Sequence, residues 1–365
     1  MSTQLKDKLA SSILMDEIQN GLLGKNEGIP LNGRIGSNVQ IRRAALYLLG
    51  GFAGSGKTTW ADEMFVLQPF DYLKENRLIG KYKVIYWSME RPQVHKFAKW
   101  LSRRIYKEHG ILIPFQKILG WYNKSNPLTM NELDYVHAEK EWLDELLETT
   151  VIFNTGRQNP TGIRKFIKQI ALDHGREEKI NEYNSIYHPD DPSKIWLNIF
   201  DHIGKLKGEQ NKDRKTLLDD FSDDCSNYFR DYLGISSLYI SQFNRGISNP
   251  MRIKNGDVEP MPEDFKETGD IYEDADMVFT IFDPWRYKVP DPSGFDLSRL
   301  KDLDGKKYYR NIKLMKNNYG IEDLRYGYAY EPISGIFKLL PKLKDMHPSI
   351  YDEVLNGNYY LNDAY

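Results

Sequence analysis

Hydrophobic positions follow two different spacings along the central part of the chain. Short apolar, β-branched runs predict strands at 45–49, 82–87, 150–153, 195–200, 237–240 and 277–281. Apolar residues three or four positions apart predict helices at 58–66, about 94–105, a pair around 131–149, 161–173 and 214–233. The buried face of the second helix is expected to consist of Val94, Phe97, Leu101 and Ile105. Alternation of strands and helices is typical of a mostly parallel sheet covered by helices on both faces.

The beginning of the chain departs from this alternation. Residues 4–23 predict a helix, and 24–37, rich in Gly, Asn and Pro, predicts a linker. The apolar face of this helix is incomplete and consists of Leu9, Ile13, Ile18 and Leu22. An isolated helix of this length is marginally stable in water, so we expect it to dock on a folded surface.

The pattern changes again after Lys307. Closely spaced strands are expected at about 308–316, 324–330 and 335–339, which indicates an antiparallel extension of the sheet. The tail beyond Pro341 has no clear period and is expected to pack loosely or to be disordered. The predicted units are a linker helix with its tether (1–37), an α/β core domain (38–341) and a C-terminal tail (342–365).

Charge and composition limit the possible partners. Lys and Arg number 50 against 52 Asp and Glu, so any surface for nucleic acid must be local. The single cysteine, Cys225, excludes a disulfide framework and lies on the apolar stripe of the helix at 214–233, where it is expected to fill the core. No apolar run approaches the about 18 residues of a membrane span, and no signal peptide precedes the first helix. We therefore expect a cytoplasmic protein with no membrane partner.

The strongest chemical signal is a glycine-rich run, Gly51-Phe52-Ala53-Gly54-Ser55-Gly56-Lys57-Thr58. It matches the phosphate-binding loop pattern G-x-x-x-x-G-K-[ST] in full and lies between an expected strand and an expected helix. Backbone N–H groups of such a loop can face a phosphate, Lys57 can reach the outer phosphates and Thr58 can hold Mg²⁺. The expected nucleotide contacts are Gly51, Gly54, Ser55, Gly56, Lys57, Thr58 and Thr59. This run predicts a nucleoside triphosphate site.

Polar side chains follow three of the expected strands. Asp201 comes directly after one, where a Mg²⁺-side carboxylate is expected, and Glu90 lies just past another, where it can polarise the attacking water. Gln242 follows a third, and its amide can sense the γ-phosphate by hydrogen bonding. Because carboxyl ends of parallel strands meet at one edge, we expect these groups beside the phosphate loop. The charged segment 176–194 precedes a strand instead and is expected to be a surface loop.

Five motifs in this order resemble the motor domain of DnaB-type replicative helicases, a ring-forming branch of the RecA-like ATPases. The similarity covers roughly residues 28–340. The matching runs are Gly28-Ile29-Pro30, Ser88-Met89-Glu90, Asp201-His202, Ser241-Gln242-Phe243-Asn244-Arg245 and Lys266-Glu267-Thr268-Gly269-Asp270-Ile271-Tyr272-Glu273-Asp274-Ala275-Asp276. The resemblance implies a RecA-like P-loop ATPase core, ATP and Mg²⁺ as cofactors, and Glu90 as catalytic base. It also implies a homo-oligomeric ring, expected to be a hexamer, with single-stranded DNA and a primase or helicase loader as partners.

Two departures from the family pattern change these expectations. The family's usual N-terminal domain is missing, and only the tethered helix 4–23 remains, which we expect to dock on an adjacent subunit. The family's late motif Lys-x-Arg-x-Gly appears as Lys316-Asn317-Asn318-Tyr319-Gly320, so the arginine that reaches a neighbouring subunit's nucleotide is Asn318. Lys316 remains as a catalytic candidate, but as a point charge without the bidentate fork of arginine. A missing arginine finger typically costs about 10³–10⁵ in rate, so weak turnover is expected.

Two loops leave the expected sheet at its nucleotide edge, and in the family such loops line the central channel of the ring. The loop after Asp201 is locally basic, with Lys205 and Lys207, and the loop after Gln242 carries Arg245. The resemblance gives the family's role of gripping the DNA backbone to Lys266, Glu267 and Gly269. Contacts of this kind imply DNA binding that is independent of sequence and sensitive to salt.

Three functions remain open on the sequence alone. The first is a DnaB-like ring that hydrolyses ATP and translocates on single-stranded DNA. The second is a non-translocating RecA-like protein of strand binding or recombination, in which ATP orders a filament. The third is a structural or regulatory ring that nucleotide stabilises with weak hydrolysis. The motif at 266–276 favours the first, and Asn318 favours the third.

Overall fold

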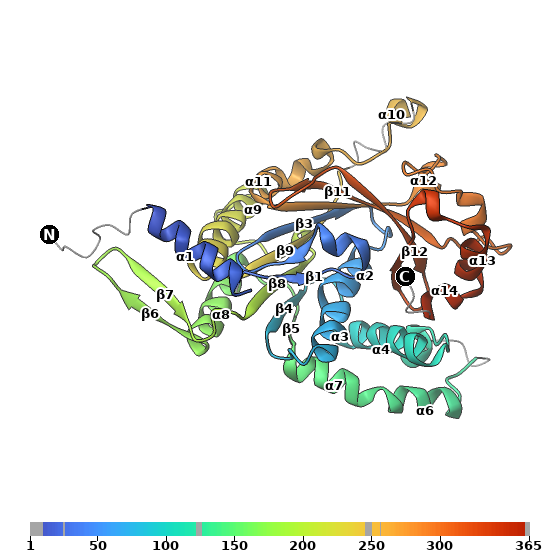
Figure 1. Cartoon of the computed structure of the whole chain (residues 1–365), viewed down its shortest axis with the longest axis horizontal. Helices are drawn as coiled ribbons and strands as arrows, with labels where there is room; N and C mark the ends of the chain where they lie inside the picture. The colour runs from blue at the N-terminus through green and yellow to red at the C-terminus, as the bar shows by residue number, and fades with distance from the viewer. Residues whose placement is uncertain (1–9, 25, 122–125, 245–249, 256, 362–365) are drawn as a thin grey trace.

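A nine-stranded sheet forms the centre of the computed structural model, which describes residues 10–24, 26–121, 126–244, 250–255 and 257–361 (Figure 1). Its strand order is β13-β12-β11-β10-β3-β9-β8-β4-β5. The strands are β3 (Leu46–Gly51), β4 (Tyr82–Ser88), β5 (Val151–Thr155), β8 (Ile195–Asp201), β9 (Ser236–Gln242), β10 (Met277–Phe282), β11 (Tyr309–Asn317), β12 (Leu324–Glu331) and β13 (Ile336–Leu339). Neighbours from β5 to β10 are parallel, and those from β10 to β13 are antiparallel. The predicted parallel sheet with an antiparallel C-terminal extension is confirmed.

Helices cover both faces of the sheet, as the alternating pattern predicts. One face packs against α2 (Lys57–Asp62), α3 (Gln68–Glu75), α4 (Gln93–His109) and α7 (Lys140–Thr149). The other packs against α8 (Pro160–Asp173), α9 (Arg214–Asp223) and α11 (Gly269–Asp274). Further helices are α5 (Phe115–Ile118), α6 (Met130–Ala138), α10 (Pro250–Asn255) and α12 (Pro284–Tyr287). Since both faces are covered, the central strands are largely apolar, and every residue of β3 and β10 is buried.

Two helices continue through π-helical turns. Residues Glu63–Leu67 join α2 to α3, and Asp224–Tyr232 extend α9, so the helix predicted at 214–233 is confirmed with a change of winding. Cys225 lies in the second π-helical segment, is fully buried and belongs to the apolar core of that face. Burial raises the pKa of its thiol. The prediction that Cys225 fills the core is confirmed.

The buried face of α4 differs from the prediction. Val94 is exposed, whereas Lys96 and Arg103 are buried. Both cations are inside because carboxylates of the preceding helical segment meet them: Lys96 Nζ lies 3.0 Å from Asp62 Oδ2, and Arg103 Nη2 lies 2.7 Å from Glu63 Oε1. Apolar spacing could not reveal this face, since paired charges replace apolar residues on it.

The segment expected to be a surface loop is a β-hairpin. Strands β6 (Gly175–Lys179) and β7 (Ser185–Pro189) pair antiparallel and form a separate two-stranded sheet. Figure 1 shows this hairpin extending away from the body of the molecule. Its side chains are mostly exposed, with Tyr183 beside the turn 89% exposed. The predicted surface position is correct and the predicted irregular structure is wrong, because charges interrupt the apolar alternation that would indicate strands.

The predicted linker is shorter than 24–37. Strand β1 (Ile29–Pro30) pairs with β2 (Gln40–Ile41), and a 3₁₀ turn, Gly33–Ser37, lies between them. Leu31 and Ile35 are buried in the core. The chain is therefore packed from Ile29 onward, because three apolar residues among the Gly, Asn and Pro anchor it. The preceding helix, α1 (Ala10–Leu22), confirms the helix expected at 4–23 within the described residues.

The tail after Pro341 is also ordered, so the expectation of loose packing or disorder is wrong for residues 342–361. It forms α13 (Pro348–Asn356) and α14 (Asn358–Leu361), which pack against the end of α4 and the antiparallel strands. Tyr359 donates a hydrogen bond of 2.6 Å to the Leu339 carbonyl. Aromatic residues of this short segment fill a third apolar cluster, and α14, with four residues, is too short for apolar periodicity to predict it.

Candidate nucleotide-binding site

Four strand ends meet at one edge of the sheet and carry the groups that the sequence singles out. In the strand registers Gly51 pairs with Gln242, Ser88 with Asp201, and Asp201 with Ile240. Because β3, β4, β8 and β9 are parallel, the phosphate loop, Glu90, Asp201 and Gln242 follow the same edge. The predicted grouping of these residues at the carboxyl ends of the strands is confirmed as geometry.

The phosphate loop joins β3 to α2. Gly54 and Gly56 have φ angles of +78° and +99°, in the left-handed region where glycine is favoured. At Gly51 a Cβ atom would lie 2.6 Å from Ile281 Cγ2 on the neighbouring strand β10. Backbone conformation at Gly54 and Gly56 and close packing at Gly51 therefore favour glycine at these three positions, and the helix starts directly after Gly56.

Arginines from the C-terminal half hold the back of this loop. Arg286 donates to the Ala53 carbonyl at 2.7 Å, and Arg310 donates to the Ser55 carbonyl at 3.0 Å. Ser55 itself is buried, and its hydroxyl donates to the Phe52 carbonyl at 2.9 Å. Sequence reasoning missed both arginines, since nothing in their local pattern links them to a loop more than two hundred residues away.

Lys57 lies inside the loop. Its Nζ donates to the Gly51 carbonyl at 2.8 Å and to the Phe52 carbonyl at 2.7 Å. Burial lowers the pKa of Lys57 to about 8, although the carboxylates of Asp201 and Glu90 oppose this shift. The site thus contains a desolvated cation that the charge of a phosphate group would stabilise.

Thr58 and Asp201 form the oxygen pair predicted for Mg²⁺. The Thr58 hydroxyl donates to Asp201 Oδ1 at 2.8 Å, and Asp201 is buried. Mg²⁺ prefers hard oxygen ligands and is commonly bound by one or two protein groups together with substrate phosphates and water. Within the described ranges no group of three or more His, Cys, Asp or Glu could hold a metal by itself. The pair therefore fits Mg²⁺ that a nucleotide helps to bind.

A cavity of about 330 Å³ opens among these groups. Its walls bring together Gly54, Gly56, Lys57, Thr58, Thr59, Glu90, Asp201 and Gln242. Basic side chains of α4 complete the lining, including His95, Lys96 and Lys99. Lys99 has no ion-pair partner in the part of the chain that the structure describes, and burial followed by the nearby Lys96 lowers its pKa. A cavity with an oxygen pair on one side and cations around it suits a polyphosphate with its metal.

A buried charge network holds the far oxygen of Asp201. Lys96 Nζ contacts Asp201 Oδ2 at 3.3 Å, Asp62 Oδ2 at 3.0 Å and the Tyr86 hydroxyl at 2.6 Å. Burial raises the pKa of Asp62, and the ammonium of Lys96 opposes this shift. Sequence reasoning missed the network. A signal exists, because Asp62 and Glu63 stand in the otherwise apolar run from Trp60 to Leu67, where charges require buried partners.

Lys316 and Asn318 lie away from this cavity in the same chain. Strand β11 is antiparallel to β10, and Lys316 pairs with Val278 near the beginning of β10, at the opposite edge of the sheet from the phosphate loop. Lys316 Nζ donates to the Glu273 carbonyl at 2.8 Å, and Asn318 Nδ2 donates to Asp276 Oδ1 at 3.2 Å. The structure does not bring Lys316 to the nucleotide of its own chain, so action on a neighbouring subunit stays a prediction.

The predicted DNA contacts are only partly described. Lys205 ends the 3₁₀ turn Ile203–Lys205 and is half-buried, whereas Lys207 is exposed. Other cations of this loop are engaged within the chain, since Lys212 pairs with Glu209 and Asp220. Arg245 lies outside the described residues. Lys266 and Glu267 lie in the 3₁₀ segment Pro262–Thr268 and Gly269 begins α11, but their side chains are outside the described part.

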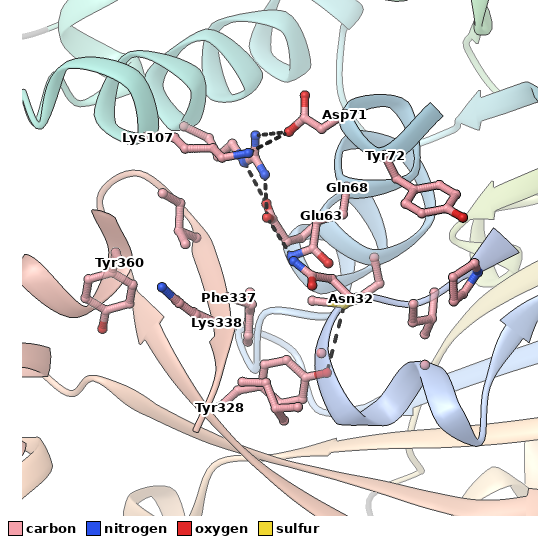
Figure 2. Close-up of a pocket in the computed structure, with 18 of the residues that line it drawn as sticks. Asn32, Glu63, Gln68, Asp71, Tyr72, Lys107, Tyr328, Phe337, Lys338 and Tyr360 are labelled. Carbon is pink, nitrogen blue, oxygen red and sulfur yellow. Dashed lines mark hydrogen bonds and ion pairs between the residues drawn. The ribbon is translucent and has the colours of Figure 1, made fainter. Parts of the chain in front are cut away.

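A larger groove of about 800 Å³ lies among α3, the end of α4, the linker and strand β13 (Figure 2). Figure 2 shows Lys107 and Asp71 facing each other across an ion pair, with Glu63 beside them. Arg103, the buried cation of this groove, is likewise paired with Glu63 and Asp71. Because these charges neutralise one another, the groove offers weaker chemistry for a phosphate than the smaller cavity, which we take as the nucleotide site.

Comparisons with known proteins identify the fold. No family model matches the chain, and no curated protein sequence matches it. A solved structure described as an "ATPase Domain" aligns with a TM-score of 0.64 and 16% identity, over 92% of this chain and 100% of that chain. A KaiC-like protein, PH0186 from Pyrococcus horikoshii OT3, aligns with a TM-score of 0.40 and 10% identity over 83% of this chain and 92% of that chain. The likeness to this second protein is too weak to inform the fold.

The first match confirms the fold that the motifs imply, a RecA-like ATPase fold. At this level of identity it shows the fold alone. The chain also contains no helix, within the described ranges, that is long and apolar enough to cross a membrane.

Proposed function

We propose that the chain is a DnaB-like, Mg²⁺-dependent ATPase that assembles as a ring of six copies and translocates on single-stranded DNA. One observation carries the ATPase part: the phosphate loop, Glu90, Asp201 and Gln242 line one cavity, with Thr58 and Asp201 joined at 2.8 Å. The order of the five motifs supports an ATP-driven ring that translocates on DNA, since the run from Lys266 to Asp276 is the most specific of them.

Five residues of the cavity wall have roles in this proposal, and Lys96 supports one of them. Lys57 neutralises the outer phosphates, and Thr58 and Asp201 hold Mg²⁺, which when bound offsets the charge that develops on the transferring phosphoryl group. Glu90 orients and polarises the attacking water. Gln242 hydrogen-bonds the γ-phosphate through its amide and carries the signal to the loop that follows β9. The ammonium of Lys96 fixes the Asp201 carboxylate from behind through Oδ2, which leaves Oδ1 beside Thr58.

We further propose that α1 joins neighbouring copies. Leu14, Ile18 and Leu22 lie at spacings of four on this helix, and each is exposed, Leu22 to 83%. A stripe of this kind on a helix of 13 residues needs a partner surface. Every copy carries both the helix and the core, so a second copy supplies the surface. Deleting residues 1–24 should yield a folded monomer, and a truncated chain that still sediments as the full ring contradicts this role.

One observation favours a second function, a ring with weak hydrolysis. Asn318 stands where the resembled family has the arginine that acts on the neighbouring nucleotide, and here its amide is hydrogen-bonded to Asp276. An amide cannot supply charge to a transition state. A ring that nucleotide stabilises, with weak turnover, is therefore the alternative. Lys316 is the cation of the family motif that this chain keeps, and its ammonium could act between subunits.

One experiment separates these functions: the ATPase rate with and without single-stranded DNA, measured on samples whose assembly mass is determined in parallel. Hydrolysis that DNA stimulates in a six-copy assembly supports the translocating ring. A ring that binds ATP but shows negligible turnover with or without DNA supports the alternative. A chain that binds no nucleotide contradicts both.

A further inference from the structure

His202 is a buried side chain at the nucleotide edge that the proposed mechanism leaves unused. It follows Asp201 at the end of β8, lines the same cavity and is only 7% exposed. Its Nδ1 accepts a hydrogen bond of 3.1 Å from the Gly204 N–H. A ring that accepts at Nδ1 carries its proton on Nε2, so Nε2 is a donor.

This donor has no hydrogen-bond partner in the described part of the chain, although it is buried. An unpaired buried donor is uncommon and destabilises the folded chain. Glu90 Oε2 lies 4.0 Å from His202 Nε2, just beyond hydrogen-bond distance. The structure therefore places a fixed donor opposite the carboxylate that is proposed to act on water.

Glu90 in turn lacks a partner that would hold it. Its side chain is 47% exposed, and it makes no hydrogen bond to the described residues. A general base must lie within about 3 Å of the proton that it takes, so an unrestrained carboxylate loses efficiency. In the part of the chain that the structure describes, His202 Nε2 is a buried donor that lies 4.0 Å from the Glu90 carboxylate.

We propose that His202 is a positioning residue: its Nε2–H holds the Glu90 carboxylate, and its Nδ1 ties that carboxylate to the loop that follows β8. The inference deepens the proposed ATPase function and rests on it. The loop packs closely against the His202 imidazole, because a Cβ atom on Gly204 would lie 2.7 Å from His202 Cε1 and 2.8 Å from Nδ1. The same loop continues to Lys205 and Lys207, the predicted DNA contacts. A shift of the loop on DNA therefore moves the imidazole and, through it, Glu90.

Two amide substitutions test separately the two contacts of His202, that of Nε2 with Glu90 and that of Nδ1 with the Gly204 N–H. His202→Asn keeps an acceptor near the position of Nδ1 but cannot reach Glu90, and His202→Gln keeps a donor near the position of Nε2 but loses the bond to Gly204. His202→Phe removes both, and His188→Asn on the exposed hairpin is the matched control. For each variant we would measure kcat and KM for ATP with and without single-stranded DNA, and the melting temperature.

His202→Asn and His202→Phe should lower kcat about tenfold with KM unchanged, the equivalent of one hydrogen bond to a charged group. His202→Gln should restore part of the basal kcat and lose stimulation by DNA. Variants with the full kcat and DNA response of an active wild type overturn the inference and leave the proposed function intact. An equal loss in Asn and Gln variants, with raised KM and lower melting temperature, overturns it in favour of a packing role. A wild-type chain that binds no ATP overturns the proposed function and this inference together.

Discussion

The two ends of the parallel strands carry polar groups in opposite states. At the amino end of β4, Lys81 contacts Asp191 at 3.0 Å and the Ser193 hydroxyl at 2.7 Å. The hydroxyl of Ser193, together with Lys81, lowers the pKa of Asp191 to about 2. At the carboxyl end burial raises the pKa of Asp62 and lowers that of Lys57. Polar groups at the amino end are exposed to solvent and paired with one another. Those at the carboxyl end are desolvated, and some of them lack a partner of opposite charge.

This difference indicates where a ligand is needed. Polar groups at the amino end are paired locally, so their removal should change little. At the carboxyl end the structure leaves two desolvated cations, Lys57 and Lys99, without an ion-pair partner in the described ranges. Groups of this kind are stabilised by a bound partner of opposite charge or by a hydrogen-bond acceptor. A nucleotide polyphosphate with Mg²⁺ provides both.

The largest expected effect follows from removing the desolvated cation of the loop. Lys57→Ala should abolish detectable ATP binding, because the outer phosphates lose the ammonium closest to the loop carbonyls. The matched control is Lys81→Ala at the amino end, which should bind ATP like the wild type. Isothermal titration calorimetry of both variants checks this. Equal affinity in the wild type and Lys57→Ala would remove the loop from the nucleotide site.

Glu90→Gln should separate binding from turnover. The amide keeps the shape of the side chain but cannot accept a proton from water, and losing general-base catalysis typically lowers kcat by about 10²–10⁴. Binding of ATP should be retained, since Glu90 acts in the transition state. Single-turnover hydrolysis beside an equilibrium binding titration measures both quantities. Unchanged hydrolysis in this variant would assign the water-activating role to another group.

Lys96→Met tests the buried network in the folding equilibrium. The substitution leaves Asp62 and Asp201 buried without their shared cation, and breaking a buried pair in this way costs about 3–5 kcal/mol of unfolding free energy. Lys81→Met is the matched control, because its ion pair is exposed and should contribute about 0–1 kcal/mol. Urea denaturation of both variants gives the values. The double variant with Asp62→Asn should recover part of the loss, and equal stabilities of the two single variants would contradict the network.

The fold was predictable because its signals are local. Short buried strands, amphipathic helices and a glycine-rich loop each appear within a few residues, and parallel pairing follows from their alternation. The grouping of Lys57, Glu90, Asp201 and Gln242 was also predictable, since it requires only that each follows a strand in one parallel sheet.

Contacts between distant segments were not predictable in the same way. The pairs of Lys96 with Asp62 and of Arg310 with the Ser55 carbonyl join residues whose own neighbourhoods show no shared pattern. The hairpin at 175–189 and the helices from Pro348 onward were not predicted for a different reason. In the hairpin, charged residues obscure the apolar alternation of its strands. The C-terminal helices gain their stability from an aromatic cluster formed with β12 and β13.

The ionisation of Lys57 predicts how ATP affinity changes with pH. The free protein loses the lysine proton around a pKa of about 8, whereas bound phosphates would raise that pKa and require the ammonium. Binding above this pH therefore takes up a proton, and affinity at pH 9 should be about tenfold lower than at pH 7. Titrations with ATP in EDTA, which removes the metal, follow this effect alone. Lys57→Arg, which stays charged, is the control, and an equal slope in that variant would assign the pH dependence to another group.

The smallest effect is expected in the segment that leads into α11. Lys266→Ala should weaken binding of single-stranded DNA about equally for unrelated sequences and reduce the salt slope by about 1, because a phosphate contact releases counterions whatever the base. Basal hydrolysis should be measured beside it, since only the DNA-stimulated part is expected to fall. Lys194→Ala, at the amino end of β8, is the matched control and should change neither slope nor affinity. Fluorescence anisotropy at several salt concentrations with two oligonucleotides gives both values. A Lys266→Ala chain with the affinity and slope of the wild type would place this segment outside the DNA path, and the weakly hydrolysing ring would then explain the molecule better.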